Sequence, residues 1–151
     1  MAETTAPKQI EPKRLGDYLE VMSKAVFQSG MSWKVVESKW AGTREAFQGF
    51  DAEKVAALRG RALEALAVDK RLIRNRRKIA AVVDNAARMI ELEKEHGSFK
   101  KYLRSQGGFD ATLAAIKKDF KFMGPMGVYY FLYVVREEVP SHKEFEARYR
   151  N

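Results

Sequence analysis

Apolar residues recur along much of this chain every three or four positions, which is the spacing of one face of an α-helix. The clearest case is residues 15–29, where Leu15, Leu19, Met22 and Val26 share a face. The strict alternation of a half-buried strand is missing almost everywhere. The pattern therefore predicts an all-α protein.

Capping residues and the same spacing predict a further series of short helices. Ser32 is a suitable N-cap for a helix that begins at Trp33 and is interrupted by Gly42, and Asp110 is a suitable N-cap for a later helix. After the first helix, the predicted helices are 33–48, 52–58, 61–67, 73–96, 98–103, 110–118, 125–135 and 141–150. Many short helices with short connections predict one irregular multi-helix domain over residues 14–151, unlike a four-helix bundle. Residues 1–13 are polar and are expected to form a disordered or loosely held N-terminal arm.

Composition excludes several kinds of site. The chain has no cysteine and only two histidines, His96 and His142, so disulfides and thiolate metal sites are ruled out. Little material remains for a zinc centre or a nucleophile–histidine site, and no cofactor is expected. No apolar run is long enough for a membrane span or a signal peptide, which favours a cytoplasmic location. No heptad pattern indicates an oligomer, so a monomer is expected.

Charge points towards a polyanionic partner. Lys and Arg number 28 against 20 Asp and Glu, giving a net charge of +8. Clustered cations gain affinity for nucleic acid by releasing counterions from phosphates. The alternative is a well-solvated basic surface, and the placement of the charges decides between the two.

The segment from Phe120 to Pro125 lies between two predicted helices. Gly124 is expected to turn with positive φ, while Phe120 and Phe122 anchor the turn in the core. Backbone N–H groups of such a turn, with the helix start at Pro125, suit a hairpin that grips DNA phosphates without reading sequence. An ordinary basic corner between helices is the alternative. The cations around this turn are Lys117, Lys118 and Lys121.

A second basic segment covers residues 71–78, at the predicted start of the longest helix. Cations at a helix N-terminus oppose the helix dipole, and a phosphate contact would explain them. We expect Arg74, Arg76 and Lys78 to bind DNA phosphates. The alternative is a solvated basic face.

Trp33 follows a glycine turn at the start of a predicted helix. A tryptophan there can form the wall of a cleft, and a flipped base needs an aromatic ring to replace its lost stacking. The alternative is that Trp33 belongs to the core.

Five segments of the chain form a recognisable series. They are FQSGMSW at 27–33, REAFQGFD at 44–51, LIRNRRKI at 72–79 with Asn85 and Ala86 following, GSF at 97–99 and FKFMGP at 120–125. Taken together, these segments resemble the DNA-3-methyladenine glycosylase I family, within the helix-hairpin-helix DNA glycosylase superfamily. They occur in the family's order with fitting spacings, and the resemblance covers about Leu15 to Val139.

The resemblance implies a base-excision enzyme. Such a protein binds damaged double-stranded DNA, flips an alkylated purine such as 3-methyladenine into an aromatic pocket, and hydrolyses its N-glycosidic bond. The alkylated base is cationic and leaves without a strong general acid, so no catalytic residue is assigned. Trp33 would be the stacking residue of the pocket.

The chain departs from the family at the base contact. Eight residues before Trp33 the family has a glutamate that hydrogen-bonds the flipped base, and this chain has Ala25. Glu20 matches another family position, but five residues rotate it about 140° away from Ala25 on a helix. We expect Glu20 to be a poor substitute.

The family's N-terminal segment, with zinc ligands and pocket aromatics, has no counterpart in residues 1–14. His142 falls near a family zinc ligand, but Glu146 stands where a cysteine would follow. We therefore expect no zinc, and termini held in another way, for example by the 141–150 helix. Tyr18 is a candidate for the space of a lost pocket aromatic.

Three functions remain open on this sequence. The leading one is a divergent DNA glycosylase that acts on an alkylated purine. The second is a non-catalytic DNA-binding protein on a glycosylase scaffold. The third is a helical interaction domain whose basic surface meets an acidic protein.

Overall fold

The computed structural model describes residues 6–149. Over this range the chain forms ten α-helices and one 3-10 turn, and it contains no strand, which confirms the all-α prediction. The elements in chain order are α1 (Leu15–Gln28), α2 (Trp33–Ser38), α3 (Trp40–Ala46), η1 (Gln48–Phe50), α4 (Ala52–Ala56), α5 (Arg61–Ala67), α6 (Arg76–His96), α7 (Phe99–Arg104), α8 (Phe109–Asp119), α9 (Pro125–Val134) and α10 (His142–Tyr149).

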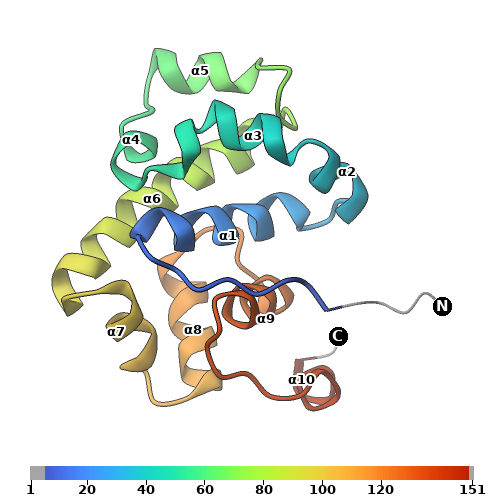
Figure 1. Cartoon of the computed structure of the whole chain (residues 1–151), viewed down its shortest axis with the longest axis vertical. Coiled ribbons are helices and arrows are strands. Elements are labelled where there is room, and N and C mark those ends of the chain that lie inside the picture. The colour runs from blue at the N-terminus through green and yellow to red at the C-terminus, as the bar shows by residue number, and fades with distance from the viewer. Residues whose placement is uncertain (1–5, 150–151) are drawn as a thin grey trace.

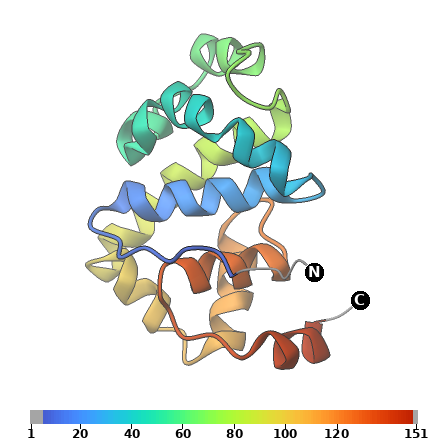
Figure 2. The ribbon, with the colours of Figure 1, turned by 45° about the vertical axis from the view of Figure 1, so that its right-hand side comes forward.

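Two helices organise the fold. The longest, α6, contacts α1, α4, α5 and α7, and α1 also packs against α9. Figure 1 shows α2 to α5 on one side of α1, and α7 to α10 on the other side. The turned view in Figure 2 shows the same two groups, with α1 still between them.

The predicted apolar faces form the core. Leu19, Met22 and Val26 of α1 have no exposed surface, and neither do Ile79 and Val82 of α6. Most helices here are too short to be stable alone in water, so burial of these faces against neighbouring helices stabilises them. Within the described residues, every helix is too short or too polar to cross a bilayer.

The helix predicted from Trp33 to residue 48 is divided, and the break lies at Lys39 instead of Gly42. Lys39 has a φ of −103° and a ψ of 3°, which ends α2 before α3 begins. Gly42 continues the helix, and its role is close packing. A Cβ there would lie 2.7 Å from the carbonyl oxygen of Arg71.

The longest helix starts three residues later than its apolar spacing predicted. Asn75 is its N-cap, and the Asn75 side chain accepts a hydrogen bond of 3.1 Å from the backbone N–H of Lys78. A side-chain cap of this kind defines the helix start more sharply than hydrophobic spacing does. Asp110 was likewise expected to cap its helix, but α8 begins at Phe109.

Residues 6–13 are held more closely than a loose arm would be. The Ile10 N–H donates to the Val134 carbonyl at 2.8 Å, and the Arg136 side chain donates back to the Ile10 carbonyl at 3.2 Å. The Gln9 side chain donates to the Tyr133 carbonyl at 2.8 Å. The segment therefore lies along the end of α9, where Figure 1 shows it passing below α1. Residues 1–5, the rest of the predicted arm, lie outside the described residues.

Aromatic packing holds the C-terminal helix. The Phe145 ring stacks on Tyr129 with centroids 4.4 Å apart, and the Tyr149 ring stacks on Phe145 at 5.2 Å. Asp110, free of a capping role, accepts hydrogen bonds of 2.5 Å from the Arg148 and Tyr149 side chains. These contacts fix α10 against α8 and α9.

Candidate functional site

A cavity of about 910 Å³ lies where the end of α1, the start of α2, the 120–124 hairpin and α9 meet. Aromatic rings and small residues make up most of its wall, and among the described residues no Asp, Glu, Lys or Arg lines it. Its aromatic members are Trp33, Phe122, Tyr129, Tyr130, Tyr133 and His142. Such a wall suits a flat, apolar ligand that is recognised by stacking and shape.

Trp33 stands at the first position of α2 and lines this cavity. Ser32 caps the helix as predicted, by accepting from the Val35 N–H at 3.4 Å. The Trp33 side chain is 51% exposed, so it does not belong to the core. Its ring meets that of Tyr130 edge to face at 5.4 Å, and the contact supports the indole from one side. Its role in stacking on a base stays a prediction.

Lys78, expected to bind phosphate, is instead buried. Its ammonium donates to the backbone carbonyls of Phe27, at 3.1 Å, and Ser29, at 2.5 Å. Cations are favourable at the C-terminal end of a helix, and these bonds satisfy carbonyls that α1 leaves open. Burial lowers the pKa of the Lys78 ammonium. The residue therefore fixes the turn that leads from α1 to Trp33.

Two tyrosines of the cavity wall have their hydroxyls in different settings. Burial is the main cause that raises the pKa of Tyr130 to about 12, so its hydroxyl keeps its proton at neutral pH. Burial also raises the pKa of Tyr129, whose hydroxyl donates to the Pro140 carbonyl at 2.8 Å. Tyr129 thereby ties the cavity wall to the segment before α10.

Ala25 lines the cavity and is buried on α1. It faces Gly127 of α9, where an added Cβ would lie 3.7 Å from the Ala25 Cβ. Glu20 points elsewhere, as its helical rotation predicted. Its carboxylate accepts from the Trp40 indole at 2.9 Å and from Arg44 at 3.2 Å, which joins α1 to α3. Over residues 6–149, the cavity wall therefore has no carboxylate that could replace the one absent at position 25.

Tyr18 was expected near the cavity, but it is a core residue. Its ring packs edge-on against Phe99 at 5.1 Å and lies 6.4 Å from Phe131. It precedes Ala25 by about two helical turns, packs against the start of α7 and does not line the cavity.

The hairpin between α8 and α9 has an unexpected turn. Gly124 is extended, with a φ of −84° and a ψ of −178°, and the positive φ of +59° belongs to Phe122. Phe120 is buried as predicted, but Phe122 is 38% exposed, and Met123 takes the buried position. Pro125 begins α9, as expected.

Asn85 holds this hairpin from α6. Its buried amide accepts from the Lys121 N–H at 2.8 Å and donates to the Lys121 carbonyl at 3.1 Å. Both backbone groups of one hairpin residue are thus bound by a single side chain. In the sequence, Asn85 belongs to a family motif, but no local pattern indicates this role.

The predicted phosphate-binding cations have different surroundings. Lys117 and Lys118 are exposed in the last turn of α8, and Arg74 is exposed before α6. Lys121 is exposed but pairs with Asp84 at 2.8 Å. Arg76 pairs with Glu64 on the surface, where such a pair contributes little and opens easily.

Arg77 also belongs to the basic segment at residues 71–78, but it was not among the predicted phosphate-binding residues. Its guanidinium lies 5.9 Å from the centroid of the Phe122 ring, beside the hairpin and the cavity. Only the placement of the start of α6 against the hairpin distinguishes Arg77 from its neighbours in sequence.

The part of the chain that the structure describes does not provide the family's metal ligands. Across residues 6–149, no three His, Asp or Glu side chains converge on a common point. His142 instead lines the cavity, with its ring 5.9 Å from that of Tyr129. Aromatic contacts hold the segment that follows it.

Comparison with known proteins agrees with this architecture. The family model described as Methyladenine glycosylase matches residues 16–115. DNA-3-methyladenine glycosylase 1 of Escherichia coli (strain K12) is 31% identical over 126 residues, covering 70% of this chain and 67% of the relative. The DNA-3-methyladenine glycosylase of Haemophilus influenzae is 36% identical over 78 residues, covering 52% of this chain and 42% of that relative.

Solved structures of this kind of enzyme also superimpose well. The 3-methyladenine DNA glycosylase I of Staphylococcus aureus gives a TM-score of 0.74 at 25% identity, over 85% of this chain and 79% of the other. A solution structure of a 3-methyladenine DNA glycosylase I gives 0.70 at 27% identity, over 86% and 79%. With a family match over residues 16–115 and the same helical fold, this chain belongs to the methyladenine glycosylase family.

Proposed function

We propose that this chain is a DNA base-excision glycosylase that hydrolyses the N-glycosidic bond of an alkylated purine, such as 3-methyladenine. The observation that carries the proposal is an aromatic cavity directly beside a basic hairpin, in a member of the methyladenine glycosylase family. A base pocket and a phosphate grip must be neighbours in an enzyme that flips a nucleotide out of the duplex.

In the cavity, Trp33 stacks on the flipped base and replaces the stacking that the base loses in DNA. Purines alkylated at a ring nitrogen are cationic, and aromatic faces attract cations. When the glycosidic bond breaks, its electron pair neutralises that charge on the departing base. Water then forms the new bond to the sugar carbon and releases its proton to solvent. The base therefore leaves without a carboxylic acid to protonate it.

The hairpin side supplies affinity without sequence preference. Lys117, Lys118, Lys121 and Arg74 are exposed. The hairpin backbone, Gly124 and the first turn of α9 after Pro125 offer N–H groups to a phosphate. Arg76 and Lys121 join this grip once their surface pairs with Glu64 and Asp84 open. Double-stranded DNA with a damaged base is thus the proposed partner. The protein is further proposed to be a monomer that works in the cytoplasm and needs no zinc.

Ala25 favours one alternative, a non-catalytic DNA-binding protein on this scaffold. A buried alanine cannot hydrogen-bond a base. The protein would then keep its DNA grip and lack the recognition needed for excision.

The test is release of free base from methylated duplex DNA, resolved by chromatography, with heat-inactivated protein as control. Release of 3-methyladenine means that stacking suffices without a carboxylate at position 25. Release of a different alkylated base means that the Ala25 cavity has another specificity. No release from alkylated or deaminated duplexes, together with salt-sensitive DNA binding, establishes the non-catalytic alternative.

A further inference from the structure

Phe122 adopts a backbone conformation that is unfavourable for a residue with a bulky side chain. Its φ of +59° lies in the left-handed region, which is a rare conformation for bulky residues. The ring is 38% exposed and lines the cavity, so core packing does not explain a phenylalanine here. Glycine would form the same turn with less strain. The ring therefore needs an explanation outside the folding of the hairpin.

Hydrogen bonds and buried side chains hold the surrounding hairpin. Asn85 binds both backbone groups of Lys121, and Phe120 and Met123 are buried on either side of the turn. Phe122 is thus presented at the opening of the cavity by a turn that cannot easily withdraw it.

Arg77 completes this arrangement. Its guanidinium lies within 6 Å of the Phe122 ring centroid, the range of a cation–π contact. No salt bridge engages Arg77 in the part of the chain that the structure describes, whereas Arg76 pairs with Glu64. A guanidinium beside an aromatic ring can still direct its N–H groups to a phosphate.

We infer that Phe122 and Arg77 form a clamp for the backbone of the flipped nucleotide. The Phe122 ring packs on its deoxyribose, and Arg77 binds an adjacent phosphate. A base that enters the cavity leaves its sugar at the opening, where the exposed Phe122 ring lies. The inference rests on the proposed base flipping, but it does not depend on which base is excised.

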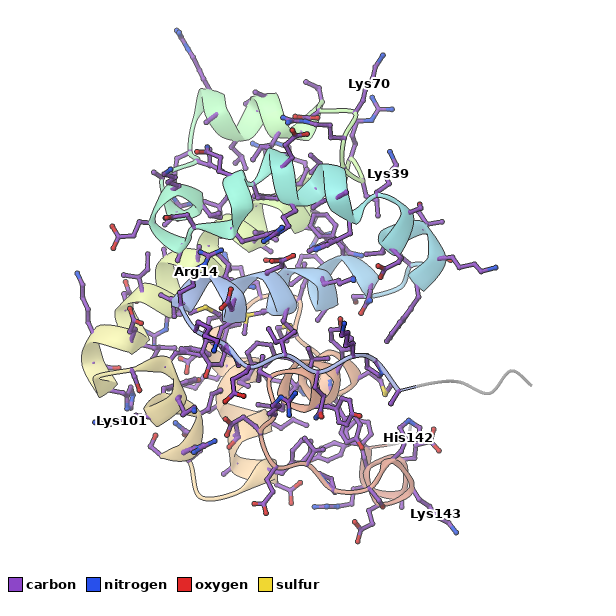
Figure 3. All side chains as sticks on the ribbon, viewed as in Figure 1. Arg14, Lys39, Lys70, Lys101, His142 and Lys143 are labelled. Atoms are coloured by element: carbon purple, nitrogen blue, oxygen red, sulfur yellow. The ribbon has the colours of Figure 1, made fainter. Side chains whose placement is uncertain are left out.

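The experiment compares binding to an undamaged duplex and to one with a single tetrahydrofuran abasic analogue. The analogue keeps the sugar and phosphates, flips readily and cannot be hydrolysed. The variants are Phe122→Gly and Arg77→Gln. Each is first shown to be folded, with an unfolding temperature that is higher than that of the wild type or within a few degrees of it. Lys101→Gln removes the same charge from α7, and Figure 3 shows Lys101 far from the cavity-lining His142.

We expect Phe122→Gly to lower the preference for the abasic duplex about tenfold, by analogy with the loss of an aromatic contact to a nucleotide. It should leave the salt dependence of binding to undamaged DNA unchanged. Arg77→Gln should lower the same preference and reduce the slope of log K against log salt by about one. Lys101→Gln should keep the abasic preference.

The clamp is wrong if both variants keep the wild-type preference, as Lys101→Gln does, or if the wild type has no such preference. Base release from methylated DNA, measured in parallel, separates this result from the proposed function. In one outcome, both variants lose the abasic preference and the wild type releases no base. This outcome supports the clamp and removes the glycosylase activity. Base release by the wild type, with an unchanged abasic preference in both variants, supports the glycosylase activity and removes the clamp.

Discussion

Individual residues at the end of α1 determine how the cavity is built. Lys78 binds the carbonyls of Phe27 and Ser29, and Gly30 turns with a φ of +71°. The following residues then place Trp33 at the cavity wall. Lysine is needed here for its reach and its several donors, because each open carbonyl at a buried helix end costs about 1–3 kcal/mol.

Replacement of Trp33 by alanine tests the stacking role. Base stacking on an aromatic ring contributes about 1–3 kcal/mol. We therefore expect Trp33→Ala to lose most of the preference for damaged over undamaged duplex, while nonspecific affinity at equal salt stays within about twofold of wild type. Competition binding with the two duplexes measures both values. Equal loss on both DNAs would show that Trp33 supports the fold instead of the base.

At the scale of elements, the hairpin between α8 and α9 is positioned from a distant helix. Asn85 of α6 is buried and binds the Lys121 backbone on both sides. This contact holds α8 and α9, the two helices that flank the hairpin, in position relative to α6. A loop that binds phosphate gains from such rigidity, because less conformational entropy is lost on binding.

Asn85→Ala should release the hairpin from α6. The Lys121 N–H and carbonyl lose their partners, so we expect the free energy of unfolding to fall by about 2 kcal/mol. DNA affinity should fall even under conditions where the variant is fully folded. Urea unfolding and DNA titration at low temperature measure the two effects. As a control, Asp84→Asn removes the carboxylate that pairs with the exposed side chains of Lys121 and Arg59, and it should weaken stability less.

At the scale of the whole molecule, a polar network connects three helices. Asp119 of α8 accepts hydrogen bonds from Arg88 of α6 at 2.8 Å and from the Tyr102 hydroxyl of α7 at 2.7 Å. Burial pushes the pKa of Asp119 up, but the hydrogen bonds from Tyr102 and Arg88 outweigh burial, and the pKa is lowered overall. The ionised carboxylate therefore stabilises the packing of α6, α7 and α8.

This network predicts a pH dependence of stability. Because the folded pKa of Asp119 lies below its unfolded value of about 3.9, its contribution is complete above pH 4 to 5 and is lost as the pH falls through the folded pKa. Asp119→Asn should lower the free energy of unfolding by about 1–3 kcal/mol at pH 7, and by less near pH 3. Urea unfolding at the two pH values measures this. Glu91→Gln, which removes an exposed partner of Arg88, should have little effect.

The net charge of +8 is a property of the whole molecule. For DNA binding, the positions of the cationic side chains matter more than their total charge. Replacing Lys117 and Lys118 by glutamine should reduce the slope of log K against log salt by up to about two, since each phosphate contact contributes about 0.9. The same replacement of Lys100 and Lys101 on α7 should leave the slope near its wild-type value. Filter binding over a range of salt concentrations gives the slopes. Identical slopes for the two double variants would place the DNA on another face.

The sequence by itself determined the helical class, most helix positions and the Ser32 cap. It also determined the family resemblance and the absence of a carboxylate at position 25. These features are local, because helical spacing and capping depend on residues within a few positions of one another. At the start of α6 a second local signal competed with apolar spacing, because the Asn75 cap sets the first residue of the helix. At Gly42 the competing factor was not local: the residue resembles a helix break, but it packs closely against the distant Arg71 carbonyl.

Only the tertiary structure decided which predicted site residues meet. Lys78 reaches a carbonyl 49 residues away, Tyr18 packs against Phe99 of α7, and Arg77 meets Phe122 through the packing of α6 against the hairpin. Neighbouring cations in one basic segment look alike in sequence. Their roles differ because burial and partners come from elements far apart in the chain, and no local pattern encodes those contacts.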